Sequence, residues 1–248
     1  MALATRIDLP APSRVAGGLL TAARPLPDGW VRGVTFGGNS CLAPQPWPYC
    51  IDEDSSPSEK TAQAPGDIAV FEPTGIVQAV ECTTLSRDSS MQKAEEALAA
   101  TADYQLGAEL TDGAVTGNPN FGQAVSAGAA ANNYAEALAT LEAAAASELQ
   151  GRLAYVHASY ASLTRLLSEH AIWRDGRIWR TAAGNVVVTS AGYDFSRLYA
   201  TGEVFAAVTA PESRVDIDRA VNQSVAYAEQ LGLVVFDPCF NVYSEVSD

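Results

Sequence analysis

Positive charge is scarce in this sequence. It has 15 lysines and arginines against 29 acidic residues, a formal net charge of −14, and lysine occurs only at Lys60 and Lys93. A protein that binds nucleic acid tightly needs a clustered basic surface to neutralise the phosphates. The composition therefore argues against tight nucleic-acid binding.

Long apolar runs are also missing. No stretch approaches the roughly 18 apolar residues that a membrane-spanning helix requires, so we expect no membrane association. Residues 15–23 faintly resemble the core of a signal peptide, but Arg24 and Pro25 interrupt it. Apolar residues still make up 48% of the 248 residues and charged residues only 18%. This balance favours one large folded domain or two closely joined ones.

Cysteine pairs with the spacing of a metal site are absent. The cysteines stand at positions 41, 50, 82 and 239, with no C-x-x-C pair and no histidine cluster, so we expect no zinc site. Cys41 and Cys50 bracket a proline-rich loop and could close a short disulfide in an oxidising exterior. The alternative, reduced and partly buried thiols, suits a protein made in a cytoplasm.

Catalytic motifs are missing too. Nucleophilic catalysis needs a serine or cysteine near a histidine and a carboxylate, and the only histidines, His157 and His170, stand in no motif. Ser190 lacks the first glycine of a nucleophile elbow, because position 188 is valine. No glycine motif for phosphate or dinucleotide binding occurs. We therefore predict structural roles for both histidines, no catalytic residue, no metal and no cofactor.

Two irregular stretches carry apolar side chains that a loop cannot easily bury. Residues 1–29 contain four prolines and little periodicity, which indicates an extended arm. Residues 40–67 are rich in proline, serine and acids, yet include Trp47, Tyr49 and Ile51. A loop this long is usually functional or disordered. These three side chains are candidates for contacts with another subunit, and local packing is the alternative.

Periodicity predicts a mixture of helices and strands. A capped helix over residues 88–112 spans about six turns, and a second helix begins near Asn132 and Asn133. Residues 215–230 fit a helix or a strand, and periodicity alone does not decide between them. Other expected elements are two strands within 67–82, strands at 153–159, 185–190, 198–210 and 233–238, a helix at 160–171, and a turn at 174–177 between short strands. Gly202 indicates a bulge within the strand at 198–210.

The carboxy-terminal part resembles a known family. The order of elements after residue 149 and the ending of the chain are similar to those of the major capsid proteins of tailed bacteriophages. These proteins share the Hong Kong 97-type fold with encapsulin nanocompartment shells. The resemblance favours a strand at 220–230. The matching residues of the ending are Glu229, Gly232, Leu233, Val234, Val235, Phe236 and Pro238.

The resemblance implies an α+β fold with an N-terminal arm, an extended E-loop, a long spine helix, and peripheral and apical domains. Some members crosslink a loop lysine to a peripheral-domain asparagine with the help of a nearby glutamate. Lys60, Asn241 and Glu245 would take these roles here, and a solvated loop charge is the alternative for Lys60. The implied boundaries are 1–29 for the arm, 30–85 for the E-loop and flanking strands, 86–150 for the peripheral domain with the spine helix, 151–210 for the apical domain, and 211–248 for a return strand to the peripheral domain.

The same resemblance implies a function. The chain would assemble with itself, as pentamers and hexamers, into an icosahedral head shell around double-stranded DNA. It would be made in the host bacterial cytoplasm, belong to the virion, and have portal, scaffold or decoration proteins as partners. Alternatives are an encapsulin-like shell, another virion component such as a connector or tail protein, and, from a different class, an oligomeric α/β enzyme with an unrecognised site.

Overall fold

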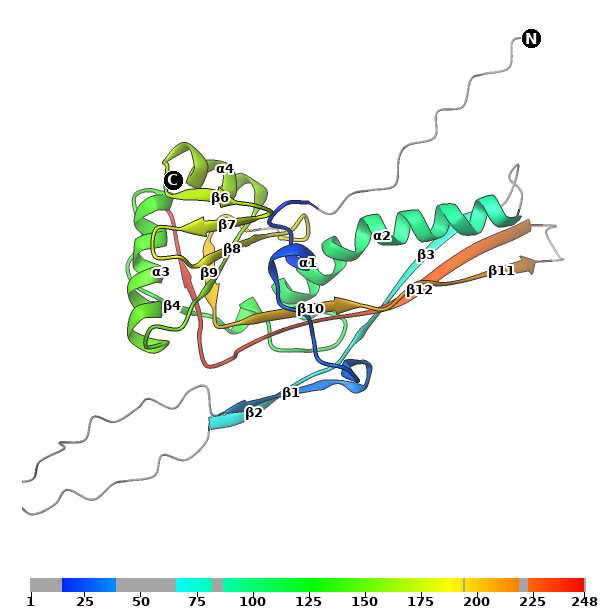
Figure 1. Cartoon of the computed structure of the whole chain (residues 1–248), viewed down its shortest axis with the longest axis horizontal. Helices are drawn as coiled ribbons and strands as arrows, with labels where there is room; N and C mark the ends of the chain where they lie inside the picture. Colours follow the sequence, from blue (N-terminus) through cyan, green and yellow to red (C-terminus); the bar gives the residue numbers. More distant parts are fainter. Residues whose placement is uncertain (1–14, 39–65, 82–86, 194, 219–222, 248) are drawn as a thin grey trace, which may run out of the picture.

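Two β-sheets organise the chain. The computed structural model describes residues 15–38, 66–81, 87–193, 195–218 and 223–247. Within this part the strands form a seven-stranded sheet, a four-stranded sheet and a separate two-stranded ribbon of β1 (Val34–Gly38) and β2 (Gly66–Phe71). The seven-stranded sheet lies at one end of the molecule, and the four-stranded sheet extends with the long helix toward the other end (Figure 1).

The seven-stranded sheet is covered on both faces. On one face Val187 shares a core with helices α3 (Tyr134–Glu148) and α4 (Tyr160–Ser168), and on the other Val186 and Val188 enter a core rich in aromatic rings. Burial on both faces explains the unbroken β-branched run of this strand. In sheet order, the strands are β4 (Val125–Ser126), β13 (Asn241–Ser244), β9 (Leu198–Thr201), β5 (Tyr155–Ala158), β8 (Val186–Thr189), β7 (Ile178–Thr181) and β6 (Ile172–Asp175).

Polar side chains cap the two helices of this body. The Asn133 side chain accepts a hydrogen bond from the backbone amide of Glu136 at 2.8 Å, at the start of α3. The Ser159 hydroxyl accepts one from the amide of Ser162 at 3.2 Å, at the start of α4. Each cap satisfies an amide that has no partner within its helix. The helix start expected near Asn132 and Asn133 is therefore confirmed.

The four-stranded sheet is built on one long strand, β12 (Gln223–Phe236). β10 (Val204–Val208) and β11 (Glu212–Asp218) pair with successive parts of one side of β12, and β3 (Thr74–Glu81) pairs with its other side, all antiparallel. The stretch 215–230, which fitted either helix or strand, thus forms β-structure wherever the structure describes it.

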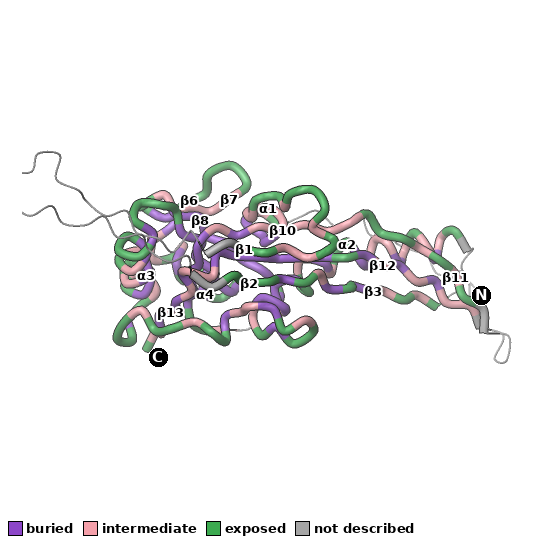
Figure 2. The backbone as a smooth tube through the Cα atoms, turned by 90° about the horizontal axis from the view of Figure 1, so that it is seen from below, coloured by how far each residue is buried: buried purple, intermediate pink, exposed green. Residues whose placement is uncertain are grey.

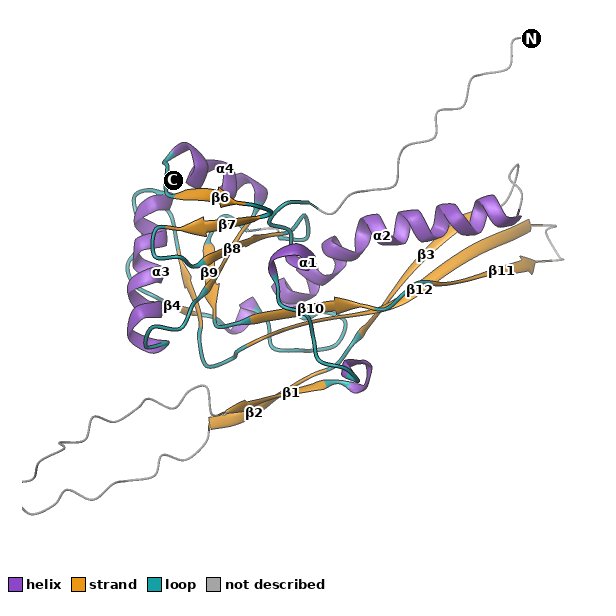
Figure 3. Cartoon of the chain, in the orientation of Figure 1, coloured by secondary structure: helices purple, strands orange, loops and turns teal. Residues whose placement is uncertain are grey.

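Helix α2 (Arg87–Asp112) lies along one face of this sheet (Figures 1 and 3), which confirms the long helix predicted from the sequence. At 1.5 Å per residue, its 26 residues span about 39 Å. Buried side chains recur along it at four-residue spacing, on the stripe that faces the sheet. They are Ala94, Leu98, Ala102, Leu106 and Leu110.

One expected strand is two strands. The sequence predicted a single strand over 198–210 with a bulge at Gly202, but β9 ends at Thr201 and β10 begins at Val204. These strands belong to different sheets, because the chain passes from one sheet to the other at Gly202 and Glu203. The expected last strand, 233–238, is likewise the end of β12, and the sequence analysis missed β13 beyond it.

Residues 15–29 contact their own subunit. Helix α1 (Leu19–Ala22) places Leu19 in the core, fully buried. Arg24 pairs with β10: its amide donates to the Val204 carbonyl and its carbonyl accepts from the Ala206 amide, both at 2.9 Å. A 3-10 turn, η1 (Trp30–Arg32), follows. The residues around Leu19 and the backbone of Arg24 thus pack against their own subunit, whereas residues 1–14 lie outside the described part.

Candidate assembly surface and the junction between the sheets

The contact residues named from the sequence lie outside the described residues. This holds for Trp47, Tyr49, Ile51 and Lys60, and for the cysteines of the predicted disulfide, Cys41 and Cys50. Cys239 does lie in the described part, and it is disulfide-bonded. The contact residues and the pairing of Cys41 with Cys50 therefore stay predictions.

An exposed apolar surface lies on the face of the four-stranded sheet opposite to α2. Along β3, buried and exposed side chains alternate at its start, and Val77 on the outer face is 57% exposed. Leu231 of β12 is 37% exposed and faces the same side, because its partner Gly75 precedes Val77 by two residues. Figure 2 shows exposed residues along this end of the molecule. These two side chains make this face a candidate for a contact with another protein surface.

A shallow groove crosses this outer face. Its volume is about 490 Å³, and its walls come from β3, β12 and the turn that joins β10 to β11. Charged residues lie at the rim, where the Arg214 guanidinium pairs with Glu229 at 2.9 Å and with Asp216 at 3.7 Å. An apolar centre with a charged rim is the usual composition of a protein–protein interface. Ile68 and Val70 are further exposed apolar residues, on β2 of the ribbon.

The two sheets are joined where two chain segments cross side by side. One segment leads from β9 to β10 and the other from β12 to β13, and the backbone bonds between them run both ways. The Gly202 amide donates to the Phe240 carbonyl at 3.1 Å, and the Asp237 amide donates to the Glu203 carbonyl at 3.0 Å. A Cβ atom at position 202 would lie only 2.6 Å from the Asp237 Cβ. The crossing is therefore a close approach that requires glycine.

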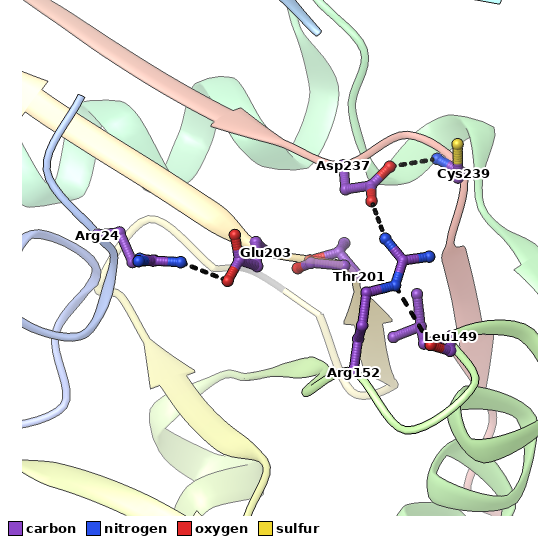
Figure 4. Close-up of polar contacts among 8 residues, drawn as sticks. Arg24, Leu149, Arg152, Thr201, Glu203, Asp237 and Cys239 are labelled. Carbon is purple, nitrogen blue, oxygen red and sulfur yellow. Dashed lines mark hydrogen bonds and ion pairs between the residues drawn. The ribbon is translucent and has the colours of Figure 1, made fainter. Parts of the chain in front are cut away.

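Charged side chains form ion pairs and hydrogen bonds at this junction (Figure 4). Asp237 is buried, accepts a hydrogen bond from the Cys239 amide at 3.1 Å and lies 3.4 Å from the Arg152 guanidinium. On the other segment, Glu203 pairs with Arg24 at 2.5 Å. The sequence analysis did not single out these residues. Its one available signal was Gly202, whose place in an apolar run indicated a backbone irregularity.

His157 is fully buried in the aromatic core. Its Nδ1 lies 2.9 Å from the Tyr193 hydroxyl and its Nε2 lies 3.0 Å from the Thr201 hydroxyl. Because the Thr201 hydroxyl donates to the Gly202 carbonyl at 3.0 Å, it accepts from Nε2–H, and Nδ1 accepts from Tyr193. Burial lowers the pKa of His157 to about 3 and raises that of Tyr193 well above its usual value.

This arrangement makes His157 a packed, neutral hydrogen-bonding group. His170 lies elsewhere, in a left-handed backbone conformation just after α4. Among the described residues, no group of His, Cys, Asp and Glu is placed to hold a metal ion. No helix in the described ranges combines the length and hydrophobicity needed to cross a membrane.

Known proteins resemble this chain in structure. No protein-family model and no curated protein matches the sequence. The capsid of an empty GTA particle, computed with C5 symmetry, matches 97% of this chain and 100% of its own, with a TM-score of 0.61 at 13% identity. For Gordonia phage Cozz the coverages are 99% and 92%, the TM-score 0.58 and the identity 12%. A virus-like particle from Pyrococcus furiosus matches 92% of this chain and 91% of its own, with a TM-score of 0.51 at 11% identity.

These likenesses establish the fold. At such low sequence identity they show the fold of the chain and not its activity. They cover nearly the whole of both chains, so the match extends to the order and arrangement of both sheets and of the long helix. The chain has the Hong Kong 97-type capsid fold, with the α+β architecture that the sequence resemblance implied.

Proposed function

We propose that this chain is the major capsid protein of a tailed bacteriophage, a subunit that assembles with itself into the icosahedral shell of the head. The observation that carries the proposal is the structural likeness to the capsid of the GTA particle. This likeness covers 97% of this chain and 100% of the other. In this proposal the chain is a building block with no catalytic role.

The exposed surfaces of the described residues support a role based on contacts between copies. A subunit of a closed shell must make heterologous contacts, in which different patches of two copies meet. The outer face of β3 and β12 offers such a patch through Val77 and Leu231. The GTA capsid was computed with C5 symmetry, which supports rings of five copies. Rings of six, and portal, scaffold or decoration proteins as partners, belong to the same proposal.

We further propose that the shell holds double-stranded DNA by enclosure. The net charge of −14 opposes adhesion to phosphates, and containment within a closed wall requires no basic surface. The protein would be a component of the virion, assembled in the cytoplasm of the host bacterium. An encapsulin-like shell around protein cargo is the second candidate, and the likeness to the virus-like particle from Pyrococcus furiosus supports it.

Electron microscopy of the purified full-length protein tests the proposal. We expect closed, uniform shells with five-fold vertices, in negative stain and in the void fraction of size-exclusion chromatography. A subunit that stays monomeric or forms only small rings at every concentration and salt tested would contradict it. The contents of native particles separate the two candidates: nuclease-protected double-stranded DNA supports the phage head, and a protein cargo supports the nanocompartment.

A further inference from the structure

The β6–β7 hairpin gives one edge of the seven-stranded sheet an exposed, basic tip. Residues 173–177 are all exposed, and Trp173 is 48% exposed. The hairpin from Ile172 to Thr181 carries three arginines and one aspartate. In a chain with a net charge of −14, this is a local excess of positive charge. Tryptophan and arginine are enriched among the residues that dominate the binding energy of protein–protein contacts.

The opposite edge of this sheet has the complementary charge. β6 and β4 are the two outermost strands in the sheet order, and they lie on opposite sides of the seven-stranded body (Figure 1). Helix α3, which packs against β13 and β9 beside the β4 edge, contains three glutamates and no basic residue. Val125 of β4 is 63% exposed. This edge therefore offers negative charge beside an exposed apolar side chain.

A polar pocket lies between the end of α3, β4 and the segment that leads into β13. Its volume is about 560 Å³, and its walls include Val125, Glu148 and Asn241. The Asn241 side chain donates from Nδ2 to the Asn120 carbonyl at 3.0 Å. Its Oδ1 is buried and has no hydrogen-bond donor among the described residues. A buried acceptor without a donor is unfavourable and rare, so an occupant that brings N–H groups would remove this penalty.

An arginine of the β6–β7 hairpin has the chemistry that this pocket requires. Glu148 is exposed and forms no ion pair with the residues that the structure describes. A guanidinium carries five N–H donors and a fixed positive charge, so it can pair with Glu148 and donate to the Asn241 Oδ1. Arg174 uses its Nε for the Gly176 carbonyl at 2.9 Å, which leaves its two terminal amino groups for a partner.

We propose that the β6–β7 hairpin of one copy docks at the β4 edge of the next copy in an assembled ring. Arg174 enters the pocket of Glu148 and Asn241, and Trp173 packs against Val125. A second copy is the partner because both complementary surfaces belong to this chain, and a contact between two different surfaces is the heterologous kind that closes a ring. This inference rests on the proposed function and deepens it, because it names the residues of one contact between copies.

Photo-crosslinking in assembled particles tests the contact. Benzophenone-bearing phenylalanine replaces Trp173 in the full-length protein, and particles mixed from isotope-labelled and unlabelled subunits show by mass spectrometry which crosslinks join two copies. We expect crosslinks to residues 123–127 and 144–148 of another copy, about tenfold more abundant than from Tyr104, because the reaction requires close approach. Tyr104 is the matched control, 47% exposed and on α2. Particles in which position 173 does not crosslink to this edge would overturn the inference and leave the proposed function intact.

Charge exchange tests the pairing independently. Arg174→Glu and Glu148→Arg each bring like charges together at the contact, so each should lower the assembled fraction about tenfold, and the double variant should restore most of it. Arg32→Glu reverses an exposed arginine on η1, outside the seven-stranded sheet, and should assemble like the wild type. If both single variants keep their circular dichroism and assemble normally, or the double variant stays defective, the inference fails. A wild type that forms no particles would instead contradict the proposed function itself.

Discussion

Arg152 and Asp237 form an ion pair at the junction of the two sheets, with 3.4 Å between Nη1 and Oδ2. The Asp237 side chain is 4% exposed and the Arg152 side chain 47%. The guanidinium also donates to the Leu149 carbonyl at 3.2 Å, just after α3. The pair therefore ties the segment between β12 and β13 to the end of a helix of the seven-stranded body. A buried carboxylate is stable only when such partners surround it.

Removing the cation should weaken the fold of the subunit. Arg152→Met keeps the apolar stem but leaves Asp237 with one partner fewer, so we expect the free energy of unfolding to fall by about 1 to 2 kcal/mol. Arg214→Met, whose acidic partners are exposed, should cost less than about 1 kcal/mol. Urea denaturation of the unassembled variants measures both. Equal losses in the free energy of unfolding would show that the Arg152–Asp237 pair stabilises the subunit no more than an exposed ion pair does.

The close approach at Gly202 predicts a steric effect. In Gly202→Ala the new methyl group would lie 2.6 Å from the Asp237 Cβ, so the two crossing segments must separate. We expect a loss of about 1 to 3 kcal/mol in the free energy of unfolding. Gly75→Ala is the matched control, because no atom lies within 4 Å of its added Cβ. A Gly202 variant as stable as the Gly75 variant would contradict the assigned packing.

Burial of neutral His157 predicts a pH-dependent stability. Its pKa is about 3 in the folded subunit and about 6.5 in an unfolded chain, so between these values the unfolded state binds more protons. Stability is therefore lost as the pH falls below 6.5, by about 2 kcal/mol between pH 7 and pH 5 from this group alone. His157→Gln should remove that part of the pH dependence. His170→Asn, at a left-handed position that asparagine tolerates, should retain it.

The sequence predicted correctly those helices and strands that have clear local sequence patterns. The α2 helix was predicted from its capped start at residue 88 and its end at residue 112, and β8 from the β-branched run of Val186, Val187 and Val188, which the structure buries on both faces. The strand β12 was ambiguous because the apolar residues of its first half fit both a helical and an alternating spacing. Only its long-range pairing with β3 and β11 settles it.

The junction could not be predicted, because it depends on which strands become neighbours. Arg152 and Asp237 are 85 residues apart, and no local pattern relates them. Gly202 was visible as an irregularity, but its partner across the junction was not. A change of sheet between β9 and β10 looks, in sequence, like a bulge in one strand. The contact candidates Trp47, Tyr49, Ile51 and Lys60 remain predictions.

The exposed face of the four-stranded sheet predicts an assembly defect. Val77→Lys places a charge at an apolar position that we assign to a contact between copies, so shell yield should fall about tenfold or more while the subunit stays folded. Val115→Lys is the control: Val115 is 74% exposed and lies in the loop after α2. Sedimentation and circular dichroism measure yield and folding. Shells from the Val77 variant at wild-type yield would show that this face is free in the assembly.

The predicted loop gives the sharpest separation of folding from assembly. Replacing residues 41–60 by a short glycine–serine linker removes Trp47, Tyr49, Ile51 and Lys60 together. Both cores described above lie outside this range, so the subunit should keep its circular dichroism and its cooperative unfolding. If those side chains bind neighbouring copies, no shells should form at concentrations at which the wild type assembles completely.

The matched control for this deletion replaces only Trp47, Tyr49 and Ile51 by serine and keeps the loop at full length. If the apolar side chains carry the contact, this variant should fail to assemble as well, because a hydroxymethyl group offers little apolar area to bury. Assembly of the serine variant but not of the deletion would assign the contact to the loop backbone and to Lys60. Wild-type-like particles from the deletion itself would remove residues 41–60 from the assembly contacts altogether.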